Sequence, residues 1–181
     1  AESFAAGAKV LVLEDTQKVS DAQADSVCAW EDLTIMDPLY VLFTSGSTGV
    51  PKGVLVGQQV IVNYLDWLDR EFSYDSEDVF GNQAPLYFDV SMHDVYGVLY
   101  FCAKMVIIPQ KLFAFPVKLI EYMNEKKIST FLWVPSAMGI VATLRTFDVV
   151  KPEYLKHAMF AGEVLPRKQL DYWAENLPDV V

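Results

Sequence analysis

The chain has 181 residues, of which 52% are apolar, so it carries enough apolar side chains to form a folded core. Its formal net charge of −10 disfavours nucleic acid and anionic membranes as partners. No apolar run approaches the ~18–20 residues that span a bilayer, and the first residues lack the pattern of a secretory signal. Cys28 and Cys102 form no CxxC motif, which favours a reducing, cytoplasmic location without structural zinc.

Strands and helices are predicted to alternate along the chain. Strands are expected at residues 9–13, 39–43, 54–56, 78–84, 105–108, 130–134 and 157–161. Helices are expected at residues 58–72, 91–103, 117–127, 135–145 and 166–176. Ser91 can N-cap the second helix, with Asp94 three residues later. The pattern predicts an α/β fold, a single unit over residues 1–181 with a mostly parallel sheet and helices on both faces.

Both ends of the chain suggest an internal fragment. It begins with Ala1 rather than Met, and residues 179–181 read as the start of a further strand. We therefore expect a piece of a larger domain, released by proteolysis or by deliberate excision.

The most informative segment is TSGSTGVPKG, residues 44–53, between two apolar runs that predict buried strands. Glycine lets the backbone approach an anion closely, hydroxyl groups add neutral donors, and Lys52 adds a charge suited to phosphate. The segment is not the common P-loop, because Pro51 stands where the second glycine should be and Gly53 where the hydroxyl should be. It predicts a phosphate-binding loop; the alternative is a flexible surface loop rich in glycine and serine.

These residues resemble the signature loop of the adenylate-forming superfamily, which includes acyl- and aryl-CoA ligases, luciferases, amino-acid adenylation domains and D-alanine–carrier-protein ligases. The resemblance extends over nearly the whole chain. It implies part of the large N-terminal, AMP-binding domain, with the C-terminal lid domain outside the chain. It also implies that one set of residues binds the β- and γ-phosphates of ATP: Thr44, Ser45, Gly46, Ser47, Thr48, Gly49 and Lys52.

The segment FDVS, residues 88–91, follows a predicted strand. On its own, it places Asp89 where it could help Ser91 to cap the next helix. The segment also resembles the FDxS motif of amino-acid adenylation domains, in which the aspartate receives the α-ammonium group of the substrate. A carboxylate among apolar groups needs a cation, so the resemblance implies that Asp89 selects an amino acid over a plain carboxylic acid.

Two further strand ends complete the expected pocket. In AGEVLP, residues 161–166, the glycine by itself indicates an ordinary turn, whereas the resemblance places Gly162 and Glu163 beside the adenine. The resemblance also places a set of residues along the pocket around Asp89: Val90, His93, Trp133, Met159 and Ala161. The bulk of Trp133 would shorten this pocket and imply a small substrate, while His93 taken alone reads as a packed helix residue.

AGEVLP and FDVSMHDVY look especially like the D-alanine ligases, although Ala161 stands where those enzymes usually carry cysteine. A nonribosomal-peptide adenylation domain is equally compatible. The resemblance implies that ATP and Mg²⁺ convert an amino acid to aminoacyl-AMP and pyrophosphate. The aminoacyl group would then pass to the phosphopantetheine thiol of a carrier protein, through positioning and charge stabilisation rather than a protein nucleophile.

The superfamily places its adenylation lysine in the C-terminal domain. We therefore expect no catalytic residue and no metal ligand within the chain, and an isolated fragment that is inactive. Two other classes remain open. An acyl- or aryl-CoA ligase would not need Asp89, and a non-catalytic binding module would bind neither ATP nor an adenylate.

Overall fold

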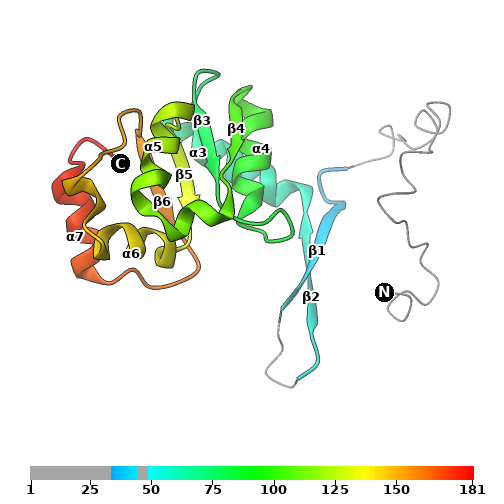
Figure 1. Ribbon diagram of the computed structural model, residues 1–181. Coiled ribbons are helices and arrows are strands. Elements are labelled where there is room, and N and C mark those ends of the chain that lie inside the picture. Colours follow the sequence, from blue (N-terminus) through cyan, green and yellow to red (C-terminus); the bar gives the residue numbers. More distant parts are fainter. Residues whose placement is uncertain (1–33, 45–48) are drawn as a thin grey trace, which may run out of the picture. The chain divides into compact units, whose positions relative to one another are not determined.

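The computed structural model of the chain describes residues 34–44 and 49–181 (Figure 1). The strand predicted at residues 9–13 and four residues of the predicted phosphate loop, Ser45, Gly46, Ser47 and Thr48, lie outside the described residues. Residues 38–181 form one compact unit, which contains the candidate site. The single unit expected over residues 1–181 stays a prediction.

A four-stranded parallel sheet forms the centre of this unit, in the order β4-β3-β5-β6. Its strands are β3 (Val79–Asn82), β4 (Lys104–Ile107), β5 (Thr130–Trp133) and β6 (His157–Phe160). Each overlaps a predicted strand, and the predicted parallel sheet is confirmed. Val181 lies beside β6: its amide donates to the carbonyl of Lys156 (3.0 Å), and its carbonyl accepts from the amide of Ala158 (2.8 Å). Residues 179–181 are not assigned as a strand, and Asp179 lies in a turn, so the strand start expected there stays a prediction.

The strands on either side of the glycine-rich segment form a separate antiparallel pair, β1 (Pro38–Thr44) and β2 (Lys52–Gly57). The prediction that both are buried was wrong, because most of their residues are exposed and the Phe43 side chain is 73% exposed. The two strands are antiparallel because the connection between them is short. A short connection can form a hairpin, whereas neighbouring parallel strands need a crossover of about a dozen residues or more.

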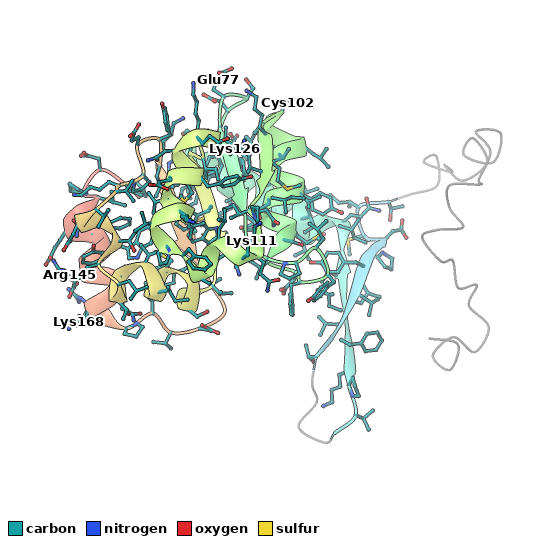
Figure 2. All side chains as sticks on the ribbon, in the orientation of Figure 1. Glu77, Cys102, Lys111, Lys126, Arg145 and Lys168 are labelled. Carbon is teal, nitrogen blue, oxygen red and sulfur yellow. The ribbon has the colours of Figure 1, made fainter. Side chains whose placement is uncertain are left out.

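Helix α3 (Gln58–Phe72) spans the residues predicted for it. The other helices of the described residues are α4 (Ser91–Phe101), α5 (Pro116–Lys126), α6 (Pro135–Thr143) and α7 (Arg167–Asn176), with short 3-10 turns at Gln110–Ala114 and Thr146–Asp148. None of these helices is long and apolar enough to cross a membrane. Helix α4 ends two residues earlier than predicted because Cys102 adopts a left-handed conformation (φ 53°); its side chain is exposed at the outer end of the helix (Figure 2).

The predicted N-cap of α4 was also wrong. Val90 occupies the cap position without a side-chain cap, and Ser91 is the first helical residue. The Ser91 hydroxyl donates instead to the carbonyl oxygen of Phe88 (2.7 Å), and Asp94 turns into the interior.

Side chains alternate between the two faces of the parallel sheet, as a strand period of two requires. Phe131 and Trp133 pack in one apolar cluster with side chains of α5, α6 and α7. Phe80 packs in a second cluster with side chains of α3 and α4, and Met159 contacts the same cluster. Helices therefore cover both faces of the sheet, as predicted (Figure 1).

Candidate active site

The candidate site is at the carboxyl edge of the parallel sheet. Strands β3 and β5 are neighbours, but β3 is followed by α4 on one face and β5 by α6 on the other. In open α/β sheets, ligands bind where the chain leaves two neighbouring strands toward opposite faces. The candidate ligand-binding residues are therefore those at the carboxyl ends of β3, β5 and β6, on the face covered by α4.

Three side chains form a row on this face: Asn82, Leu132 and Met159. Leu132 of β5 pairs directly with Met159 of β6. Phe80 pairs with Thr130, so Asn82 and Leu132, each two residues further along, extend the same face. The sequence interpretation missed Leu132. Side chains two residues apart in a strand share a face, so Leu132 lies on the same face as Thr130. The Thr130 hydroxyl lies 3.0 Å from the Tyr74 hydroxyl, on the α4 side of the sheet.

Trp133 lies on the opposite face. Its side chain is fully buried, its ring stacks on Phe131 with the centroids 3.9 Å apart, and its indole nitrogen donates to the carbonyl of Gly81 (3.0 Å). The structure thus places Trp133 in the core with α5, α6 and α7, away from the row that contains Met159. The argument that Trp133 shortens the pocket has no support in this arrangement.

Helix α4 turns His93 into the interior, where its ring packs against those of Tyr64, Tyr74 and Phe80. The side chain is 2% exposed, and its Nδ1 lies 2.9 Å from the Tyr64 hydroxyl. Its Nε2 has no hydrogen-bond partner in the described part of the chain. Burial lowers the pKa of His93 to about 4, so the imidazole is neutral at physiological pH. The structure shows the packed, uncharged helix residue that the sequence alone favours.

Asp94 is a second feature that the sequence interpretation did not assign to the site. Its side chain is fully buried, and one carboxylate oxygen accepts a hydrogen bond from the Asn82 amide at 2.7 Å. Burial raises the pKa of Asp94 to about 7, against the opposing effect of the Asn82 hydrogen bond. The sequence indicated only a capping role, so the buried location came from the structure alone.

Asp89 lies before α4 and is exposed. One of its carboxylate oxygens accepts a hydrogen bond from the amide of Val90 (2.9 Å), the half-buried residue that follows it. Asp89 lines a pocket of about 280 Å³ with an otherwise mainly apolar wall: Leu39, Tyr40, Leu42, Leu86, Tyr87, Phe88, Met92 and Tyr96. Among the residues that the structure describes, no lysine or arginine lines this pocket, and the carboxylate is available there to a cation from outside.

The described residues of the predicted phosphate loop lie at the end of the hairpin. Thr44 pairs with Lys52, and the Thr44 hydroxyl donates to the Lys52 carbonyl at 3.4 Å. Gly49 has a left-handed backbone (φ 80°) with open space around it, and the Lys52 side chain is exposed. Thr44 and Lys52 are therefore brought together.

The turn after β6 is fixed by the neighbouring strand end. The amide of Ala161 donates to the carbonyl of Trp133 (3.2 Å), and Gly162 adopts φ +96° with open space where a side chain would be. The Glu163 carboxylate accepts from the amide of Ser136 at the start of α6 (3.3 Å), where the helix dipole favours a negative charge. Glu163 therefore ties this turn to the one after β5.

Within 34–44 and 49–181, the structure contains no group of three or more His, Cys, Asp or Glu side chains that could hold a metal ion. Mg²⁺ that arrives with ATP would be coordinated by phosphate oxygens and water, which needs few protein ligands.

Three curated relatives illustrate the similarity to known proteins. The chain is 35% identical over 152 residues to the vanchrobactin synthetase VabF of Vibrio anguillarum, covering 81% of this chain and 5% of that protein. It is 33% identical over 136 residues to an L-proline–[L-prolyl-carrier protein] ligase of Pseudomonas fluorescens (74% and 27%). It is 31% identical over 139 residues to a D-alanine–D-alanyl carrier protein ligase of Bacillus cytotoxicus (77% and 28%).

Solved structures share the fold. The Vibrio cholerae adenylation domain AlmE, in complex with glycyl-adenosine-5'-phosphate, matches with a TM-score of 0.71 at 23% identity, covering 87% of this chain and 29% of that chain. The structure of IdnL7 also matches with a TM-score of 0.71, at 26% identity over 81% of this chain and 28% of that chain. The chain thus spans less than a third of each of these relatives.

The parallel sheet, its two helical layers and these similarities define an adenylation-type α/β fold. A family model described as AMP-binding enzyme matches residues 4–181, and the chain belongs to that family. The resemblance to the adenylate-forming superfamily is therefore confirmed.

Proposed function

We propose that the chain is the phosphate-loop and substrate-pocket portion of a ligase that uses ATP to activate an amino acid. The product would be an aminoacyl-AMP, with transfer to the phosphopantetheine thiol of a carrier protein. The relatives named as carrier-protein ligases for proline and D-alanine support this assignment. The chain spans only part of those ligases, so the complete reaction requires residues beyond the chain.

The observation that carries the proposal is the placement of Asp89. An exposed carboxylate in a mainly apolar pocket, whose described wall carries no basic side chain, is suited to the α-ammonium group of an amino acid. Excluding water from such a pocket would strengthen the attraction. A plain carboxylic acid brings no cation and would leave Asp89 unpaired.

The substrate carboxylate must attack the α-phosphorus of ATP, and the roles of the chain's residues are positional. We assign the β- and γ-phosphates to the loop from Thr44 to Lys52, in which hydroxyls, backbone amides and the lysine ammonium bind anionic oxygens. We assign the adenine to the turn at Gly162, where the absence of a side chain leaves room. Mg²⁺ bound with ATP would neutralise charge that develops on the phosphates.

We propose a small, apolar amino acid as the substrate, with D-alanine as one candidate. The support comes from the size of the Asp89 pocket, about 280 Å³, and from its mainly apolar wall, which includes Leu86 and Met92. The residues at the sheet edge, Leu132, Met159 and Ala161, are not among those that line this pocket. This differs from the sequence-based argument, which used the bulk of Trp133. His93 is neutral and only 2% exposed, so its role would be packing within the fold rather than contact with the substrate.

The proposal is tested by ATP–pyrophosphate exchange in a longer protein that carries this chain with the remaining domain, using D- and L-amino acids and several simple carboxylic acids. We expect exchange with a small amino acid, reduced at least about 100-fold by Asp89→Ala, because the ammonium group loses its charged partner. Glu77→Gln, an exposed change near the amino end of β3, is the matched control and should leave exchange unchanged (Figure 2). Exchange only with simple carboxylic acids, unaffected by Asp89→Ala, would instead identify a CoA-ligase relative.

A further inference from the structure

The side chain of Asn82 makes two hydrogen bonds at the end of β3. Its amide nitrogen donates to the carbonyl of Ala84 (3.1 Å) and to the carboxylate of Asp94 (2.7 Å). Asn82 is 3% exposed and Asp94 is fully buried, so water does not compete for this second bond. Asn82 is the last residue of β3, and Asp94 lies in the first turn of α4. The bond therefore joins the two elements that flank residues 83–90.

Residues 83–90 carry Asp89, and only Ala84 among them is buried. Residues 85–89 are all exposed. Local hydrogen bonds give the segment its shape: the amide of Phe88 donates to the carbonyl of Pro85 (2.9 Å), and the Ser91 hydroxyl donates to the carbonyl of Phe88 (2.7 Å). Those bonds shape the turn without fixing it to the sheet, whereas the bond between Asn82 and Asp94 connects the two ends of the segment through buried atoms.

We infer that Asn82 and Asp94 are positioning residues for substrate recognition: their hydrogen bond holds residues 83–90 so that Asp89 faces the ammonium group of the amino acid. This inference rests on the proposed function. Neither residue needs to touch the substrate, because a shift of Asp89 by about 1 Å is enough to weaken a charge-assisted hydrogen bond.

Substitutions at Asp94 separate positioning from general stability. Asp94→Asn keeps an oxygen that accepts from Asn82, whereas Asp94→Ala leaves the Asn82 amide with only the Ala84 carbonyl. Asn82→Ala removes the same bond from the strand side, which keeps the test open if Asp94→Ala does not fold. Ser129→Ala is the matched control. It removes two buried hydrogen bonds at the amino ends of the strands, away from the segment: the Ser129 hydroxyl donates to Asp78 (2.7 Å) and accepts from the amide of Val79 (2.9 Å).

The first readout is hydrogen exchange of the chain itself, followed at the amides of Phe88, Ser91 and Met92. We expect exchange at these amides to be about tenfold faster in Asp94→Ala and Asn82→Ala than in Ser129→Ala. The comparison is made under conditions in which the variants have the same free energy of global unfolding. Asp94→Asn should keep the wild-type protection. Equal protection in Asp94→Ala and Ser129→Ala would overturn the inference.

The second readout is pyrophosphate exchange in the longer protein. We expect Asp94→Ala to raise KM for the amino acid about tenfold, with KM for ATP unchanged and Asp94→Asn close to wild type. An unchanged amino-acid KM in Asp94→Ala, or equal losses in Asp94→Asn and Asp94→Ala, would overturn the positioning role. If the amides respond as expected but no amino acid is activated, the hydrogen bond holds the segment as inferred and the proposed function is wrong.

Discussion

Leu132 of β5 and Met159 of β6 are paired residues on the α4 face of the sheet. Trp133, one residue further along, is on the opposite face and fully buried. On the α4 face β5 therefore presents an aliphatic side chain, and the indole ring belongs to the core.

This relationship predicts different effects for neighbouring substitutions. Leu132→Ala should change the preference among amino acids in pyrophosphate exchange by about tenfold in favour of larger side chains, because one or two methylene groups in an apolar pocket discriminate by about 1–3 kcal/mol. Trp133→Phe should instead lower the free energy of unfolding by about 1–3 kcal/mol and leave the preference unchanged, since it removes the indole hydrogen bond to Gly81 and part of the core packing. If Trp133→Phe changed the preference among amino acids, Trp133 would contact the substrate after all.

The positions of Leu132 and Trp133 also show which structural features sequence patterns can predict and which they cannot. Helical periodicity gave α3 with both its ends, and each strand of the parallel sheet overlaps its prediction. The pattern could not decide which face a residue such as Trp133 occupies, because a strand buried on both sides is apolar at every position and its alternation is hidden. The structure assigns the faces through the pairing of Leu132 with Met159 and the packing of Trp133 on Phe131.

Two other differences have a similar origin. The sequence indicated buried strands around the glycine-rich segment, yet the apolar residues of the hairpin are largely exposed, because apolar composition does not specify what covers a strand. Asp94 matched the pattern of a capping residue, but the capping pattern is local and does not register that Asn82 comes close from β3. Both require knowledge of contacts between distant residues.

The pH dependence of stability should reveal the two adjacent buried groups of α4. Burial raises the pKa of Asp94 to about 7, so its contribution to stability is present at low pH and is lost as the pH rises from about 4 to 7. Burial lowers the pKa of His93 to about 4, so its contribution is present above about pH 6.5 and is lost as the pH falls. The nearby Tyr64 and Tyr74 hydroxyls, whose pKa values burial raises, do not ionise in this range.

The two contributions have opposite slopes and largely cancel in the wild-type chain. Each pKa unit corresponds to about 1.4 kcal/mol, so Asp94 alone accounts for up to about 4 kcal/mol and His93 alone for up to about 3 kcal/mol. Relative to wild type, Asp94→Asn should become more stable as the pH rises from 4.5 to about 6.5, and His93→Gln should become more stable as the pH falls over the same interval. Urea unfolding at several pH values measures both. Parallel pH profiles for wild type and variants would show that neither group titrates differently in the folded chain.

Gly162 should be sensitive to substitution for a backbone reason alone. Its φ of +96° is a conformation that residues with a side chain rarely adopt, although a Cβ atom would meet nothing within 4 Å. Gly162→Ala should therefore cost about 1–2 kcal/mol in the free energy of unfolding or shift the turn. In pyrophosphate exchange, KM for ATP should rise more than KM for the amino acid if this turn accommodates the adenine. A rise confined to the amino-acid KM would place the turn on the substrate side instead.

A buried carboxylate holds the amino ends of the parallel strands together, at the end remote from the candidate site. Asp78, which is 2% exposed, accepts hydrogen bonds from the Ser129 hydroxyl (2.7 Å) and the Lys156 ammonium (2.8 Å). Burial by itself would raise the pKa of Asp78, but hydrogen bonds from Lys156, Ser129 and the Asp75 amide outweigh it, and the pKa lies below its ordinary value. The carboxylate is therefore ionised and fully paired at neutral pH.

Removing the two charges of this pair should have unequal effects. Asp78→Ala should lower the free energy of unfolding by about 2–4 kcal/mol, because it leaves the buried Ser129 hydroxyl without its acceptor and removes the link between three strands. Lys156→Met should cost less, about 1 kcal/mol, since the Lys156 side chain is 54% exposed and Asp78 keeps its other hydrogen bonds. Urea unfolding at pH 7 measures both, and acidification should weaken wild type more than Asp78→Ala, because the lowered pKa of Asp78 contributes stability that is lost as the pH falls. Equal losses in the two variants would mean that the ion pair, rather than the buried hydrogen bonds of Asp78, holds this end of the sheet.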